Sequence, residues 1–309
     1  MSTASPSHWA TTKEVGAAWG IRLLVLIYNM LGRSVLFIVL YPVVAYFFLT
    51  SRSARAASRE YLRTLSEFAP ELSLRATRTE SFRHFMNFAE SIYDRIAAWT
   101  GKITLDDVTF TGREALVEMI DAKRGALLIT AHLGSFEVCR AMAHLRGSIR
   151  LNVLVHTANA EKFNRVMRSV SPEHYVELIE VSELDPSLAI RLRQKINAGE
   201  LIVITGDRIP VKGTRATVTQ FLGRPARFPQ GPFVLASLLK CPVYTLICLS
   251  EGRRFHVYLE QICDRVLLRR GNREDDLKNY VGQFARRLER YCRRAPLQWF
   301  NFYPFWYKP

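Results

Sequence analysis

A histidine and a glutamate separated by four residues are the side chains in this sequence best suited to acid–base chemistry. His132 and Glu137 come at the end of the apolar run 126–131. An imidazole can take a proton from an attacking hydroxyl, and a neighbouring carboxylate can hold its tautomer and stabilise the imidazolium that forms. We therefore expect His132 to act as a general base with Glu137 as its partner, in the transfer of a group to an alcohol.

The residues between this pair predict a turn from a strand into a helix. Gly134 allows a tight backbone turn, and Ser135 can cap the helix that follows. Glu137 would then lie in the first helical turn, where it can fold back towards the imidazole. In open α/β sheets, ligands bind at the carboxyl ends of strands, so this segment is the expected site.

A second histidine has the same spacing to an acidic residue. His156 and Glu161 follow the apolar run 151–155, which is also a strand candidate. Thr157 and Ala158 supply a turn and a cap less directly than Gly134 and Ser135 do. The residues alone therefore favour His132 without excluding His156.

A third polar segment directly follows the apolar run 201–205. It contains Asp207 and Arg208, and Arg215 comes a few residues later. The two arginines could bind a phosphate in a forked manner. Alternatively, the segment is a plain turn in which Arg208 pairs with Asp207 in solvent.

A loop punctuated by glycine and proline is predicted over residues 221–232, before an apolar helix. Its apolar members, which begin at Phe221 and Gly223, could line a groove for an acyl chain. A purely structural loop is the alternative. The residues expected in substrate binding are therefore Ser135, Asp207, Arg208, Arg215, Phe221 and Gly223.

The cysteine pattern indicates reduced core residues in a cytosolic compartment. The chain has five cysteines, an odd number, and none forms a CxxC pair that would suggest a metal site. Cys139 alone lies near the candidate site. An alternative function is therefore a condensing or hydrolytic lipid enzyme that forms a covalent acyl intermediate on Cys139.

The net charge of +15 indicates anionic partners. Phospholipid head groups, phosphorylated substrates, acidic carrier proteins and nucleic acid are all attracted by a positive potential. We expect no nucleic acid, because the sequence has no helix-turn-helix, zinc-finger or RNA-binding signature. A non-catalytic protein that binds anionic lipids is a second alternative, but it leaves His132 without a role.

An apolar segment near the N-terminus predicts a membrane anchor. Residues 23–49 are almost wholly apolar, and a bilayer is spanned by roughly 20 such residues. Arginines follow at once, so the positive-inside rule places the rest of the chain in the cytoplasm. Arg33 and Pro42 leave open a helix that lies partly in the interface. We divide the chain into an anchor with its basic flank, 1–63, and a catalytic domain, 64–309.

The remainder predicts an α/β fold with a largely parallel central sheet flanked by helices. A helix is expected over 64–99. Short apolar runs then predict strands at 126–131, 151–155, 176–181, 201–205 and 243–249. Helical patterns lie between them at 136–145, 160–169, 186–198 and 231–240, as in a parallel sheet with crossover helices.

The C-terminal region combines a basic amphipathic helix with an aromatic tail. Apolar residues recur at helical spacing over 277–291, with arginines elsewhere around the helix. The tail, 299–307, is rich in tryptophan, tyrosine and phenylalanine. Because such rings favour the head-group level of a bilayer, we expect membrane contact, with packing in the core as the alternative.

These segments, in this order, resemble the lysophospholipid-acyltransferase superfamily and, within it, the late acyltransferases of lipid A biosynthesis that add lauroyl or myristoyl chains. The resemblance covers most of the chain. It includes the N-terminal apolar segment, the block from His132 to Glu137, the block at Asp207 and Arg208, and the Phe-Leu-Gly stretch that ends at Gly223.

The resemblance implies a membrane-associated O-acyltransferase on the cytoplasmic face of the inner membrane. It implies that the catalytic histidine is His132 rather than His156, and that Asn159, Phe163 and Arg165 handle the acceptor. The donor would be an acyl carrier protein or acyl-CoA thioester, with no metal or other cofactor.

Two departures refine the expected acceptor. Ser135-Phe136 stands where many lipid A enzymes carry Asn-Trp, and Arg208 stands where they usually carry Gln. With the ending at 298–303, the sequence is similar to the acyltransferases associated with aryl polyene lipid clusters of Gram-negative bacteria. The acceptor would then be a related membrane lipid or a polyene head group.

Overall fold

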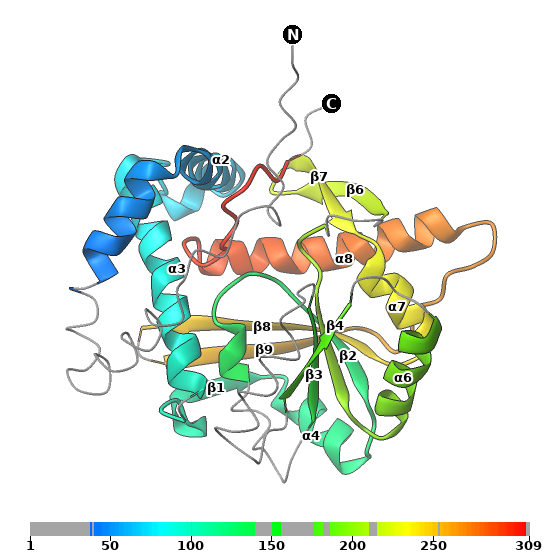
Figure 1. The fold of residues 1–309 in the computed structure, drawn as a ribbon. Coiled ribbons are helices and arrows are strands. Elements are labelled where there is room, and N and C mark those ends of the chain that lie inside the picture. The colour runs from blue at the N-terminus through cyan, green and yellow to red at the C-terminus, as the bar shows by residue number, and fades with distance from the viewer. Residues whose placement is uncertain are drawn as a thin grey trace.

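A seven-stranded sheet forms the centre of the computed structural model (Figure 1). The structure describes residues 38, 40–99, 101–139, 150–155, 176–181, 186–209, 215–252 and 254–306. The strand order is β1-β9-β8-β2-β5-β3-β4, and every pairing is parallel except that of β8 with β9. The strands are β1 (Val108–Thr111), β2 (Ala126–Thr130), β3 (Leu151–Val155), β4 (Val176–Glu180), β5 (Leu201–Thr205), β8 (Val243–Glu251) and β9 (Arg254–Cys263).

The two central strands β2 and β5 are apolar because both faces of the sheet are covered. Leu127 and Ile129 point into the core on the side of α7 and α8, whereas Ala126 and Leu128 point into the core on the side of α4. Strands buried on both faces read as continuous apolar runs rather than alternating ones, which made them recognisable from sequence.

Helices pack on both sides of this sheet. They are α2 (Arg52–Phe68), α3 (Arg78–Trp99), α4 (Arg113–Asp121), α6 (Pro186–Asn197), α7 (Gly231–Leu239) and α8 (Arg273–Arg294), with short 3-10 helices η2 (Pro70–Leu72) and η3 (Leu105–Asp107). Residues 40–50 form a further helical stretch before α2. Figure 1 shows α8 across one face of the sheet, with α2 near the C-terminal segment.

A two-stranded hairpin accompanies the main sheet and packs on α8. It pairs β6 (Ala216–Phe221) with β7 (Arg224–Pro229) in antiparallel fashion. Leu222 and Gly223 form its turn and both have positive φ, 51° and 75°, as in the two-residue turns that match strand twist. Residues 221–232 are therefore a hairpin turn, a strand and the start of α7, rather than the predicted loop.

The predicted α/β class and mostly parallel sheet are confirmed, and so are the helices expected at 186–198 and 231–240. The single helix predicted over 64–99 is wrong, because the chain breaks between α2 and α3 at Pro70, which lacks a backbone N–H for a continuing helix. Strands β1 and β9 escaped prediction because polar residues interrupt their apolar pattern. The helix expected at 160–169 lies outside the described residues, as does most of the one at 136–145.

The predicted N-terminal membrane helix is not supported by the part of the chain that the structure describes. Residues 1–37 and 39 lie outside that part, and none of the described helices combines the length and apolar character that crossing a bilayer requires. The division of the chain at residue 63 falls inside α2, and it stays a prediction.

Candidate active site

His132 and Asp207 meet where two neighbouring parallel strands end. In the β2–β5 pairing, Thr130 lies opposite Thr205. His132 follows Thr130 by two residues, and Asp207 follows Thr205 by two residues. Asp207 Oδ1 lies 2.8 Å from His132 Nδ1, and Asp207 Oδ2 accepts a hydrogen bond of 2.9 Å from the His132 backbone N–H. The contact at Nδ1 leaves Nε2 as the ring nitrogen that can take a proton from a substrate.

The environment keeps Asp207 ionised. Its side chain is 2% exposed, against 32% for His132. Burial by itself raises the pKa of Asp207, but the charge and hydrogen bonds of His132, together with Arg208, outweigh it and lower the pKa to about 2. A fixed negative charge at Nδ1 stabilises an imidazolium, which is what a histidine needs in order to act as a general base.

The C-terminal strap, residues 298–300, holds this pair in place. The Trp299 indole Nε1–H donates to Asp207 Oδ2 at 3.1 Å, and the Phe300 N–H donates to the His132 carbonyl at 2.8 Å. Gly134 N–H donates to the Gln298 carbonyl at 2.9 Å. The loop after β2 is thus fixed by backbone hydrogen bonds to a segment far along the chain.

Gly134 is required by the path of this loop. Its φ is +70°, and a Cβ at this position would lie 1.9 Å from the carbonyl oxygen of Cys248. Only glycine combines the left-handed backbone with so close an approach to another strand.

Glu137 does not contact the imidazole in this structure. It forms an ion pair with Arg95, with Arg95 Nε 2.7 Å from Glu137 Oε1, while the carboxylate at the His132 ring is Asp207. The described residues 136–139 have 3-10 conformation. Ser135 is buried and donates to Asp94 Oδ2 at 3.1 Å.

The two arginines predicted for substrate binding lie in different surroundings. Arg208 is half-buried, donates from Nη2 to the Phe300 carbonyl at 2.8 Å, and packs 5.6 Å from the centre of the Tyr303 ring. It is therefore part of the site rather than a solvent-exposed turn. Arg215 is exposed just before β6.

Phe221 and Gly223 have structural positions. Phe221 is fully buried among aromatic rings and packs against Phe228 and Trp299, and Gly223 forms the hairpin turn. The aromatic tail likewise packs in the core, so the expected membrane contact of its described residues is wrong. Its buried members are Trp299, Phe300, Phe305 and Trp306.

The other predicted residues either lie outside the described residues or are buried away from substrate. Asn159, Phe163, Arg165 and the rival His156 lie outside the described residues. Cys139 is fully buried, and its thiol therefore cannot reach a substrate. Burial, and to a smaller extent a hydrogen bond with Cys139, raises the pKa of the neighbouring Cys248 thiol. Within the described ranges, no group of three His, Cys, Asp or Glu side chains could hold a metal ion.

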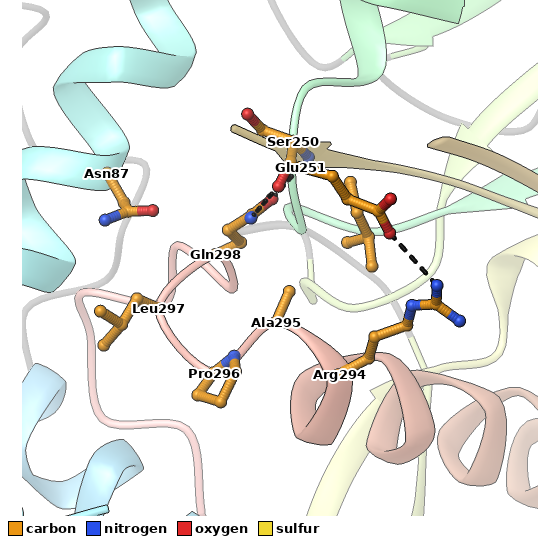
Figure 2. Close-up of a pocket in the computed structure, with 9 residues that line it drawn as sticks. Asn87, Ser250, Glu251, Arg294, Ala295, Pro296, Leu297 and Gln298 are labelled. Atoms are coloured by element: carbon orange, nitrogen blue, oxygen red, sulfur yellow. Dashed lines mark hydrogen bonds and ion pairs between the residues drawn. The ribbon is translucent and has the colours of Figure 1, made fainter. Parts of the chain in front are cut away.

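A cleft lies beside the loop that carries His132. Its outer cavity, of about 280 Å³, is lined by α3, β8, the end of α8 and the segment that follows it (Figure 2). The Gln298 amide is fixed there by two hydrogen bonds with the Ser250 backbone, and Arg294 pairs with Glu251. A smaller inner cavity shares Asn87, Ser250 and Gln298 with the outer one and reaches Gly134 and Ser135. Sequence reasoning missed this cleft, because its walls come from three distant segments.

Comparison with known proteins is consistent with this geometry. A sequence model of the bacterial lipid A biosynthesis acyltransferases matches residues 79–308, which include His132, Asp207 and the C-terminal strap. A search of curated proteins found no match for the chain.

Proposed function

This chain belongs to the bacterial lipid A biosynthesis acyltransferases, and from that premise we propose that it moves a fatty acyl chain from an acyl carrier protein or acyl-CoA thioester to a hydroxyl of a lipid A-like or aryl polyene-type lipid. The observation that carries this proposal is the His132–Asp207 pair at the adjoining ends of β2 and β5. A histidine backed by a buried carboxylate is suited to deprotonating an alcohol.

The proposed reaction is a direct transfer. His132 Nε2 takes the proton of the acceptor hydroxyl, while Asp207 stabilises the imidazolium. The acceptor oxygen attacks the thioester carbonyl carbon, and a tetrahedral intermediate forms. Its collapse makes the ester and breaks the carbon–sulfur bond, and the departing thiolate takes the proton back from His132. No acyl-enzyme forms, and the fully buried Cys139 is in no position to make one.

The developing oxyanion needs a positive partner. The backbone N–H groups of Gly134 and Ser135 are already bonded to the carbonyls of Gln298 and Cys248, so they cannot serve without rearrangement. We assign the role to Arg208, whose guanidinium lies beside Asp207 in a half-buried position. A cation aimed at developing negative charge is most effective where water is scarce.

Association with the inner membrane is supported by an exposed apolar face on residues 38–50. Leu40 and Val44 pack against α3, whereas the opposite side exposes large apolar residues, including Ile38 and Leu49 at 72% each. The other exposed members are Tyr41, Val43, Tyr46 and Phe47. Exposed arginines at positions 52, 59 and 63 follow in α2. An apolar face flanked by basic residues suits the cytoplasmic surface of an anionic bilayer.

The test compares lipids and rates in strains and with purified protein. Mass spectrometry of membrane lipids from a strain lacking the protein should show loss of an acylated lipid, which the native protein restores and His132→Ala does not. His156→Ala, which alters the histidine with the same spacing, is the matched control and should restore it. Restoration by His132→Ala at the normal rate would show that the base is assigned incorrectly.

The alternative function, a non-catalytic lipid-binding protein, predicts the opposite result for His132→Ala. Under that function, His132→Ala would bind anionic vesicles and support the cell as the native chain does. The buried charge of Asp207, held at an imidazole 32% exposed to solvent, favours catalysis instead.

A further inference from the structure

We propose that Trp299 is a positioning residue for acyl transfer, whose indole N–H fixes the Asp207 carboxylate in the orientation that serves His132. This inference rests on the proposed role of His132 as the base. Trp299 comes 92 residues after Asp207, at the point where the strap crosses the ends of β2 and β5.

The hydrogen bonds of Asp207 divide between its two oxygens. Oδ1 lies against His132 Nδ1, whereas Oδ2 accepts from the His132 backbone N–H and from Trp299 Nε1. The terminal torsion of an aspartate is broad, so a carboxylate needs several donors to stay in one orientation. Without the indole N–H, Oδ2 keeps only one of these donors.

Trp299 is itself held on its other side by a buried histidine. The Trp299 carbonyl lies 2.8 Å from His84 Nε2, and His84 Nδ1 lies 3.0 Å from Ser58 Oγ. Burial lowers the pKa of His84 to about 4, so the ring is neutral at physiological pH. A neutral ring with Nε2–H as donor and Nδ1 as acceptor satisfies both contacts. Helices α2 and α3 thereby fix the backbone of the strap.

The Trp299 ring has no freedom to move away from Asp207. It is 1% exposed and makes edge-on contacts with Tyr61, Phe221 and Phe305, with ring centres 4.8–5.1 Å apart. Leu133 and Trp299 also form an antiparallel bridge. Trp299 therefore contacts the acid through its side chain, while its neighbours Gln298 and Phe300 bond the loop of the base through their backbones.

A second tryptophan provides a matched control. Trp306 is 8% exposed, belongs to the same aromatic cluster, and donates its indole N–H to the Phe221 carbonyl at 3.2 Å. In Trp306→Phe, a buried indole loses one hydrogen bond and some ring area, as in Trp299→Phe, but Asp207 is unaffected. Any difference between the two variants reports on the contact with Asp207.

We expect Trp299→Phe to lower kcat roughly 10- to 100-fold with little change in KM, as for loss of a hydrogen bond to a charged group. The remaining carboxylate charge is less well neutralised, so the acidic limb of the pH–rate profile should move to higher pH. Other groups that interact electrostatically with Asp207 are Arg208, Cys292 and Tyr303, and both variants retain them. By the same reasoning, Trp306→Phe should keep kcat within about threefold of the native value. The acidic limb of its pH–rate profile should lie within about 0.2 pH units of the native one.

The experiment measures kcat, KM, the pH–rate profile and the thermal midpoint of the native protein, both tryptophan variants and His132→Ala. Equal losses in the two tryptophan variants, or a normal kcat in Trp299→Phe, would overturn the positioning role. If Trp299→Phe does not fold, replacing Trp299 with benzothienylalanine, which keeps the bicyclic shape without the N–H, gives the same test. An active His132→Ala would instead defeat the proposed function.

Discussion

Two carboxylates near the loop that carries His132 have different surroundings. Asp207 is 2% exposed and bonded to His132, whereas Glu137 is 22% exposed and pairs with Arg95, itself 43% exposed. In a low-dielectric site a charge acts strongly on its neighbours, whereas a solvated ion pair is worth little. The difference teaches that burial and strand order, rather than spacing along the chain, decide which carboxylate contacts the histidine in this structure.

The largest expected effect comes from removing the buried charge. Asp207→Asn should lower kcat about 10³- to 10⁴-fold, because the amide cannot stabilise the imidazolium and favours the wrong tautomer. Steady-state kinetics with a purified thioester donor checks this value. Asp207→Asn should remain folded, since the amide can still accept from the Trp299 N–H. If kcat falls less in Asp207→Asn than in Glu137→Gln, then Glu137 rather than Asp207 is the acid that acts on His132.

Part of this arrangement was predictable from sequence, and the rest depends on long-range order. The strand ends at His132 and Asp207 were visible because β2 and β5 are unbroken apolar runs. Their adjacency was not visible, since β5 joins β2 only through the order of a sheet whose members are scattered along the chain. The spacing to His132, with the turn and cap between them, favours Glu137 as the partner. A contact such as Trp299 with Asp207, across 92 residues, leaves no local pattern.

The buried His84, which holds the Trp299 carbonyl on the Asp207 side of the comparison, can be tested separately through the pH dependence of unfolding. With a native pKa of about 4, His84 stays neutral while an unfolded chain would bind a proton below about pH 6.5. The unfolded state is therefore favoured as pH falls from 6.5 to 4, and the free energy of unfolding should drop by about 3 kcal/mol from this group. Urea unfolding at several pH values measures this dependence.

The control is His84→Gln, which can keep a donor to the Trp299 carbonyl but does not titrate. Its free energy of unfolding should change less between pH 6.5 and 4 than that of the native protein. The lowered pKa of Asp207 acts in a different window, because that stability is present above pH 3.8 and is lost as pH falls towards 2. Equal pH dependence in the two proteins would show that His84 is not held neutral.

The smallest effect is expected on the solvated side of the comparison. Glu137→Gln removes one member of an ion pair whose two side chains are 43% and 22% exposed, so the free energy of unfolding should change by less than about 1 kcal/mol. Because Glu137 pairs with Arg95 rather than with His132, kcat should fall less than about tenfold, and Arg95→Gln should behave alike because it breaks the same pair. A kcat loss in Glu137→Gln that Arg95→Gln does not share would mean that Glu137 turns to the imidazole when substrate binds, as its position along the chain first suggested.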